Sequence, residues 1–287
     1  MNQLSFFDSV PTTKPVNVAS VPQRSPFRYP GGKTWLIPFI RKWMSSYDNK
    51  AINFYEPFVG GGIVGLTIAF EQLAKDITLV ELDVDVASVW KTILSNDYKW
   101  LANKIVNFDL TQQSAERELN TIATSTRDQA FQTILRNRIS HGGILAPGAG
   151  NLKYGEGGKG ILSRWYPYTL FKRIYAIGEI QDRIRFIEGD GLDFIRLHLN
   201  QSNAVFFIDP PYTAGGKKAG SRLYTHYLID HEELFNLASQ IKGDFLMTYD
   251  NSNEVYELAK RYNFNIRMIA MNNTHHAQMT ELLISNH

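Results

Sequence analysis

The chain contains no cysteine, which excludes disulfide bonds, thiolate metal ligands and a cysteine nucleophile together. It also lacks any apolar run that approaches the roughly 20 residues of a membrane-spanning helix. The N-terminus lacks the basic-then-apolar order of a signal peptide. The cytoplasm is therefore the expected location.

The chain also lacks a large excess of charge of either sign. Lys and Arg total 30 against 28 for Asp and Glu, a formal net charge of +2, so any nucleic-acid-binding surface has to be local. No metal site is expected, because "HEELF" begins like a zinc-protease helix but has Phe235 where the second ligand should stand. At 287 residues, 44% of them hydrophobic, the chain is long enough for one large domain or a domain with an insertion.

The string Gly-Gly-Lys-Thr at 31–34 lacks the context of a phosphate-binding loop. Such a loop needs an earlier glycine, where this chain has Phe27. It also needs a preceding strand, where this chain has proline-punctuated coil. We therefore interpret the glycine pair as serving another purpose.

The hydrophobic pattern predicts an α/β fold whose alternation of strands and helices is interrupted once. Strands are predicted near 51–58, 77–82, 184–189, 204–208, 244–249, 263–271 and 280–286, and helices near 63–74, 86–95, 191–199, 231–241 and 252–262. The last strand should pair antiparallel as a hairpin, which gives a mostly parallel sheet with an antiparallel edge. Between about 96 and 182, helical patterns and a Gly-rich loop predict an inserted domain.

A glycine-rich turn follows the first predicted strand. In "FYEPFVGGG" the strand ends at Pro57 and Phe58, and three glycines let the backbone turn tightly and approach a ligand at the carboxyl ends of the strands. Glu81 or Asp83 lies near the roughly 20-residue offset at which an acid accepts hydrogen bonds from ribose hydroxyls. The pair favours an adenosine-type ligand, although the spacing is not that of a dinucleotide site. The alternative is a glycine turn that packs a helix on the sheet.

The segment "FFIDPPY" at 206–212 presents hydrogen-bond acceptors after a strand. Pro210 and Pro211 have no backbone N–H, so the turn offers carbonyl oxygens and the Asp209 carboxylate. An exocyclic amine on a flipped-out base would donate both protons to Asp209 and the Pro210 carbonyl, which frees its lone pair for attack. Tyr212 adds a flat face on which a base could stack. The alternative is a rigid turn at a strand end.

Together these motifs resemble the Dam-type (D12 class) DNA adenine-N6 methyltransferases. In chain order, "RYPGGK" resembles the family's N-terminal motif, "EPFVGGG" its S-adenosyl-L-methionine (AdoMet) loop, "DVD" its acidic motif, "DPPY" its catalytic motif and "ELLISN" its last strand. The resemblance implies a Rossmann-like AdoMet-dependent methyltransferase sheet with an antiparallel last strand, plus an inserted, mainly helical target-recognition domain. It divides the chain into a flexible N-terminal tail at 1–25, an AdoMet-binding catalytic domain at 26–95 and 183–287, and the DNA target-recognition domain at 96–182.

The same resemblance implies the site residues. The Gly-Gly-Lys segment would close over the methionine end of AdoMet, Asp83 would hold the ribose, and Asp190 would lie near the cofactor adenine. Asp209 would contact both the cofactor amino group and the target amine. The implied cofactor-binding residues are Tyr29, Lys33, Pro57, Phe58, Gly60, Gly62, Asp83, Asp190 and Asp209, and the implied catalytic residues are Asp209, Pro210, Pro211 and Tyr212.

The implied reaction transfers a methyl group from AdoMet to N6 of a flipped-out adenine in double-stranded DNA at a specific site. The absence of cysteine excludes the usual route to C5-methylcytosine. Two alternatives stay open. One is a cytosine-N4 methyltransferase, which usually has Ser where Asp209 stands. The other is a non-catalytic DNA-binding protein on a methyltransferase scaffold.

The inserted region carries basic charge that the balanced total hides. Residues 129–178 hold seven Lys and Arg against one acid, with four aromatic residues interleaved between 154 and 168, a pattern typical of nucleic-acid surfaces. A solvated basic face is the alternative. Ile139 and His141 stand where the family's polar and basic readers are expected, so the recognised DNA sequence stays open. The predicted DNA contacts are Arg136, Arg138, His141, Lys153, Lys159 and Arg164.

The proline-rich tail contains the apolar cluster "QLSFFD" at 3–8. It resembles the Gln-Leu-Ser/Asp-Leu-Phe peptide by which bacterial proteins dock on the replication sliding clamp, with Phe6 in place of the usual Leu. We therefore predict that Gln3 to Phe7 binds the clamp. The alternative is that these apolar side chains only pin the tail to the domain.

Overall fold

The computed structural model describes residues 18–211, 222–223, 225–226, 228–272 and 278–286. Tyr212 and the predicted clamp peptide lie outside these residues. The strands are β1 (Asn53–Glu56), β2 (Asp76–Glu81), β3 (Ile184–Glu188), β4 (Ala204–Ile208), β5 (Asp244–Asp250), β6 (Asn265–Asn272) and β7 (Gln278–Ser285). The α-helices are α1 (Ile37–Met44), α2 (Ile63–Glu71), α3 (Val84–Ile93), α4 (Tyr98–Asn107), α5 (Gln112–Asn120), α6 (Thr126–Ile139), α7 (Pro167–Gly178), α8 (Gly191–His198), α10 (His231–Ala238) and α11 (Asn253–Arg261). Short 3-10 turns are η2 (Val18–Ser20), η3 (Thr34–Leu36), η4 (His141–Gly143), η5 (Glu156–Gly158), η6 (Gly160–Arg164) and η7 (Gln181–Arg183).

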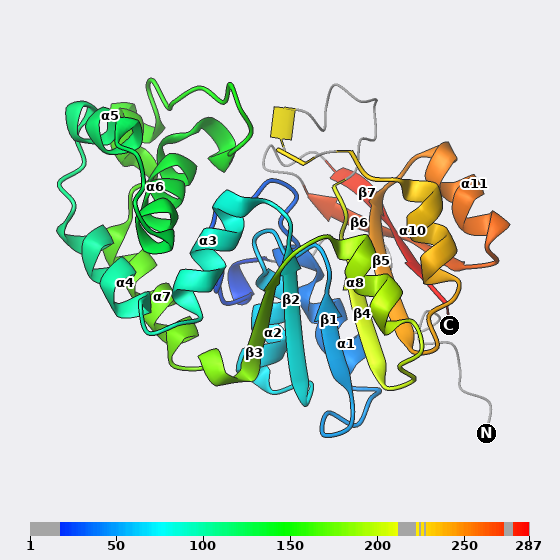
Figure 1. The fold of residues 1–287 in the computed structure, drawn as a ribbon. Coiled ribbons are helices and arrows are strands. Elements are labelled where there is room, and N and C mark those ends of the chain that lie inside the picture. Colours follow the sequence, from blue (N-terminus) through cyan, green and yellow to red (C-terminus); the bar gives the residue numbers. More distant parts are fainter. Residues whose placement is uncertain (1–17, 212–221, 224, 227, 273–277, 287) are drawn as a thin grey trace.

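The strands form one sheet in the order β3-β2-β1-β4-β5-β7-β6 (Figure 1). The first five strands along this order are parallel, and β7 runs antiparallel to both β5 and β6. The predicted mostly parallel sheet with an antiparallel last strand is therefore confirmed. One detail differs, since the returning strand of the hairpin inserts beside β5 and leaves β6 at the edge. The residue patterns account for this, because Leu282 to Ile284 are fully buried in β7 whereas Met268 in β6 is half exposed.

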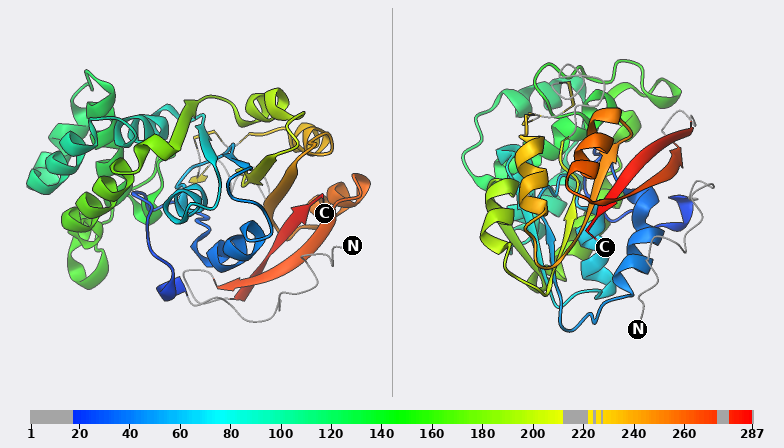
Figure 2. Two further views of the ribbon diagram at one scale, coloured as in Figure 1. Left: turned by 90° about the horizontal axis from the view of Figure 1, so that it is seen from below. Right: turned by 90° about the vertical axis from the view of Figure 1, so that its right-hand side faces the viewer.

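Helices cover both faces of the sheet (Figure 2). Successive side chains of a strand point to opposite faces, and β4 uses both. Its Val205 and Phe207 pack in the core shared with α1, α2 and α3, whereas Phe206 and Ile208 pack in the core shared with α8, α10 and α11. The near-continuous apolar run of this strand therefore follows from its central, doubly covered position.

The helices α4 to α7 lie to one side of the sheet (Figure 1). Their buried side chains, among them Leu101, Phe131 and Ile174, belong to the same hydrophobic cluster as Trp90 of α3. The inserted residues thus share a continuous core with the sheet, and the exact domain boundaries stay a prediction. None of the helices in the described ranges has the length and apolar character that crossing a membrane requires.

Candidate active site

Four chain segments meet where parallel strands end. Asp190 follows β3, Asp83 follows β2, the glycine turn follows β1 and Asp209 follows β4. Because these strands are neighbours in that order, their following residues line the same edge of the sheet. The order of the strands reverses between β1 and β4, which is the point where ligands bind in open α/β sheets. All four segments line one cavity of about 1720 Å³.

Asp83 and Asp190 both begin helices. Asp83 Oδ1 accepts hydrogen bonds from the backbone N–H groups of Asp85 (2.9 Å) and Val86 (3.2 Å), and so caps α3. Asp190 Oδ1 accepts in the same way from Leu192 (2.7 Å) and Asp193 (3.2 Å) of α8. In each aspartate the capping hydrogen bonds to Oδ1 fix the orientation of the carboxylate. The second oxygen, Oδ2, can then accept a hydrogen bond from a ligand.

The glycine turn is shaped by its packing within the protein. Gly60 and Gly62 have φ of +45° and +64°, the left-handed region that favours glycine. A Cβ on Gly60 would lie 2.6 Å from the ring of Tyr29, and one on Gly62 would lie 2.6 Å from the ring of Trp90. The indole N–H of Trp90 also donates to Gly60 O at 3.0 Å. The absence of a Cβ at these two glycines therefore leaves room for the aromatic rings of Tyr29 and Trp90. The sequence pattern alone could not tell this role from the close approach of a ligand.

Glu81 ties the ends of β1 and β2 together. Its carboxylate accepts from the N–H of Gly60 and from the N–H of Asp83, both at 2.9 Å. Burial raises the pKa of Glu81 to about 7, against the lowering effect of these backbone hydrogen bonds. Of the two acids that the sequence offered for the ribose, Glu81 thus accepts hydrogen bonds on both oxygens, while Asp83 caps its helix through Oδ1.

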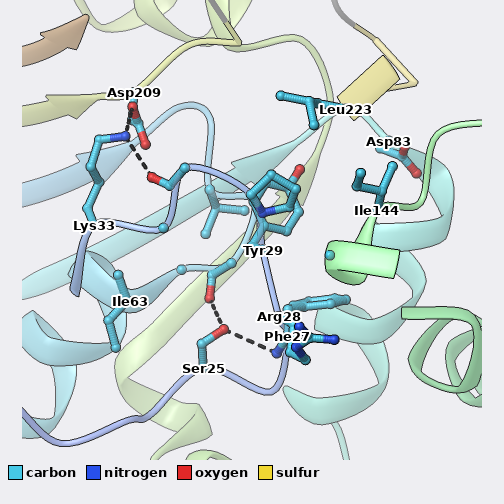
Figure 3. A pocket seen from close by; sticks show the side chains of 18 of the residues that line it. Ser25, Phe27, Arg28, Tyr29, Lys33, Ile63, Asp83, Ile144, Asp209 and Leu223 are labelled. Carbon is cyan, nitrogen blue, oxygen red and sulfur yellow. Dashed lines mark hydrogen bonds and ion pairs between the residues drawn. The ribbon is translucent and has the colours of Figure 1, made fainter. Parts of the chain in front are cut away.

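Asp209 is held by two groups on one oxygen. Lys33 Nζ lies 2.9 Å from Asp209 Oδ1, and the Thr248 hydroxyl donates to the same oxygen at 2.6 Å. Lys33 also donates to Gly31 O at 2.8 Å (Figure 3). Its side chain is 3% exposed. A lysine buried against a carboxylate is not placed to receive a phosphate. This arrangement agrees with the interpretation that the Gly-Gly-Lys string is no phosphate-binding loop.

The segment from Arg24 to Tyr29 passes between the glycine turn and the inserted helices. Ser25 Oγ donates to Gly61 O at 2.5 Å, and the ring of Phe27 contacts Trp90. On the other side, Asn137 of α6 accepts from the N–H of Arg28 at 2.9 Å and donates to its carbonyl oxygen at 2.8 Å. We refer to residues 24–29 as the strap.

The residues predicted to contact DNA fall into two groups. His141, Lys153 and Arg164 line the same cavity as Asp209, and Lys159 borders a smaller cavity beside it. Arg138 also lines the Asp209 cavity, but Arg136 and Arg138 each bind a group of the chain itself.

Arg136 Nη1 lies 2.9 Å from Asp85 Oδ2. Arg138 is 4% exposed and donates to the carbonyl oxygen of Pro26 in the strap. Burial and the neighbouring guanidinium groups of Arg173 and Arg28 lower the pKa of Arg138 to about 9. These two arginines therefore join α6 to the rest of the chain, and we leave them out of the proposed DNA surface.

Three polar residues of this region were not singled out from the sequence. Thr248, Glu281 and Asn137 are each at most 5% exposed. For Thr248 and Glu281 the available signal was a polar side chain inside an apolar strand, as in "DFLMTYD" and "TELLIS". No cluster of three or more His, Cys, Asp or Glu suited to a metal ion occurs within the described part of the chain.

Comparison with known proteins decides the family. A model of the D12 class N6 adenine-specific DNA methyltransferase family matches residues 29–272. The chain belongs to this family. The resemblance that the motifs indicated is confirmed, and the protein is an adenine-specific DNA methyltransferase that uses AdoMet and has DNA as its substrate.

Individual relatives of this methyltransferase are distant. The type II methyltransferase M1.LlaDCHI of Lactococcus lactis subsp. cremoris is 23% identical over 285 residues, which cover 91% of this chain and 94% of the relative. Among solved structures, a putative RNA methyltransferase from Pyrococcus horikoshii matches with a TM-score of 0.42 and 10% identity, over 90% of this chain and 84% of that one. The M1A22 tRNA methyltransferase TrmK of B. subtilis matches with a TM-score of 0.34 and 8% identity, over 85% and 64% of the two chains.

Proposed function

We propose that AdoMet lies along the carboxyl edge of the sheet, with its adenine near Asp190, its ribose at Asp83 and its methionine end beside Tyr29 and Lys33. The order of the strands supports this arrangement, because an elongated ligand lying along the edge meets the residues after β3, β2, β1 and β4 in that sequence. Pro57, Phe58 and the glycine turn would form the floor beneath it.

The residues present suit this ligand. Its hydroxyl and amino groups are hydrogen-bond donors, and the edge offers carboxylate acceptors. The cavity of about 1720 Å³ exceeds the roughly 300–1,000 Å³ of an ordinary small-molecule pocket, so it has space for a base beside the cofactor. When bound, the cofactor supplies a methyl group on a positively charged sulfur. The residues of the chain then have to bind, orient and exclude water.

The observation that carries the proposal is the fixed orientation of Asp209. Lys33 and Thr248 both hold Oδ1, so we assign Oδ2 to accept one proton of the adenine N6 amine. The Pro210 carbonyl would accept the other proton, with Pro211 keeping the turn rigid and Tyr212 stacking on the base. Both hydrogen bonds draw the nitrogen lone pair out of the ring, and the base has to leave the duplex to make them.

We assign the DNA duplex to the side of the cavity formed by the inserted helices. His141, Lys153 and Arg164 line the cavity there, and Lys159 lies beside it. Tyr154 and Tyr168 are 83% and 71% exposed in the same region, which suits contact with a partner rather than with the core. We also propose residues 96–182 as the target-recognition domain.

Two further assignments concern partners and location. We propose that Gln3 to Phe7 binds the replication sliding clamp, and that the enzyme acts in the cytoplasm, where its DNA substrate would be found. Because the Lactococcus relative is a type II methyltransferase, we also propose a role in restriction-modification.

The test is to incubate the protein with labelled AdoMet and unmethylated plasmid, digest the DNA to nucleosides and identify the labelled base. We expect label in N6-methyladenine, and none with Asp209→Ala, although that variant should still bind cofactor and DNA. Asp76→Ala, an exposed acid at the opposite edge of the sheet, is the matched control and should label normally. Unchanged turnover in Asp209→Ala would contradict the role of Asp209, and label in N4-methylcytosine would contradict the target base.

A further inference from the structure

A second carboxylate lies behind Asp209 on the last strand. Glu281 of β7 is 5% exposed, and its Oε2 has no hydrogen-bond partner among the described residues. That oxygen lies 3.7 Å from Lys33 Nζ, which is too long for a hydrogen bond but close enough for an ion pair. A buried carboxylate oxygen without a hydrogen bond is costly, so its position needs a reason other than stability.

The Lys33 side chain lies between the two carboxylates and interacts with both. Its ammonium group has one positive charge, and it lies 2.9 Å from Asp209 Oδ1 on one side and 3.7 Å from Glu281 Oε2 on the other. The Lys33 and Glu281 side chains are 3% and 7% exposed, so water screens the interaction weakly. Any change in the charge of Glu281 is therefore felt by the pair of Lys33 and Asp209.

The charged groups around Glu281 come from three elements. Lys33 precedes η3, Asp209 follows β4, and Asp250 ends β5, directly opposite Glu281 in the antiparallel register. Burial raises the pKa of Glu281 to about 7, while Lys33 lowers it and Asp209 and Asp250 raise it. Burial also raises the pKa of Asp250. Three acids thus share one ammonium group, and Glu281 changes its charge close to neutral pH.

We propose that Glu281 is a positioning residue for methyl transfer. Its ionised carboxylate shares the Lys33 ammonium with Asp209 and so sets how strongly Asp209 accepts a hydrogen bond from the target amine. When Glu281 is protonated, the Lys33 ammonium acts more strongly on Asp209, whose acceptor strength drops. This inference rests on the proposed role of Asp209, because Glu281 acts only through Lys33.

The sign of the pH dependence follows from this arrangement. Above about pH 7 Glu281 is ionised and Asp209 is the stronger acceptor, so the rate of the chemical step should rise with pH through that region. Glu281→Gln keeps the size of the side chain and cannot ionise. We expect it to be about tenfold slower than the wild type at pH 8, to match it at pH 6, and to lose the rise between them, a tenfold change being equivalent to one pKa unit.

The experiment measures single-turnover methyl transfer from pH 6 to 9 at saturating DNA and AdoMet. Glu281→Asp keeps a carboxylate and should keep a rise with pH, although shifted. Glu257→Gln, on an exposed acid of α11, is the matched control and should behave as the wild type. A Glu281→Gln variant with the wild-type rate and profile would overturn the proposal. So would a variant that is slower by the same factor at every pH, because that is the result of a purely structural role.

A second measurement needs no substrate. Carboxyl ¹³C resonances of the free protein, followed through pH 5 to 9, should include, besides that of Glu81, one group titrating near 7 that is missing in Glu281→Gln. Titration of that group near the ordinary pKa of glutamate would overturn the proposal. A wild type that labels no adenine would contradict the proposed function instead, so the two failures are distinguishable.

Discussion

Replacing Gly62 with alanine should disturb the active site through a ring that never touches a substrate. The glycine has a φ of +64°, and the left-handed region costs an ordinary residue roughly 1–2 kcal/mol. An added Cβ would also lie 2.6 Å from Trp90 Cζ2 and 2.7 Å from Cη2. Trp90 is fully buried, so it has little room to move, and overpacking of this kind costs roughly 1–3 kcal/mol.

The expected loss of unfolding free energy is therefore roughly 2–5 kcal/mol, the sum of these two terms. At roughly 2–4 °C per kcal/mol for a chain of this size class, thermal unfolding should occur roughly 4–20 °C lower. The measurement is a thermal or urea unfolding curve by circular dichroism. AdoMet affinity should fall as well, because Gly60 and Trp90 share a hydrogen bond of 3.0 Å.

Gly148→Ala is the matched control for this prediction. Gly148 has a φ of +86°, but no atom lies within 4 Å of an added Cβ, so only the conformational cost applies there. Trp90→Phe removes the two crowded ring atoms and should reduce the cost of Gly62→Ala in a double-mutant cycle. If Gly62→Ala is no more destabilising than Gly148→Ala, or if Trp90→Phe leaves its cost unchanged, the steric reasoning is refuted.

Two other predictions concern partners. Lys153→Gln should weaken binding to any duplex and reduce the slope of log K against log salt by about 1. Lys50 is exposed at the opposite edge of the sheet, so Lys50→Gln should change neither quantity. An unaltered slope for Lys153→Gln would count against the proposed DNA surface. Deleting residues 3–7 should abolish capture by the immobilised sliding clamp without altering activity on short duplexes, whereas deleting residues 12–16 of the same tail should preserve capture. Failure of the intact protein to bind the clamp would reject that role.

Much of the fold could be predicted because the amino-acid composition of each strand reflects how deeply the strand is buried. "AVFFI" and "DFLMTY" are apolar because both faces of the sheet are covered, and β4 and β5 occupy 204–208 and 244–250 as central strands. The position of β7 between β5 and β6 was not predictable from pairing propensity alone. It depends on which hairpin strand completes the central core, and Leu282 to Ile284 are the residues that do so.

The candidate site was predictable where a motif is contiguous and less so where it is assembled from distant segments. Asp209 and Lys33 were each singled out, but their direct contact was not, because they lie far apart in the sequence and meet only in the folded protein. The burial of Arg138 could not be predicted from the sequence for a similar reason. Its partner, the carbonyl of Pro26, belongs to the strap, and a basic residue on a helix does not reveal from its own sequence which segment will cover it.

The strap has a consequence for protein engineering. Exchanging target-recognition regions between related methyltransferases is an obvious route to enzymes with new specificities, and a cut at residues 96 and 182 would look natural. Asn137 of the insert, however, forms hydrogen bonds with both backbone groups of Arg28, and Arg173 donates to Ser25 O at 3.0 Å. The same strap holds the glycine turn through Ser25 and Tyr29. In a working chimera, residues 24–29 and the insert would therefore have to come from the same parent enzyme.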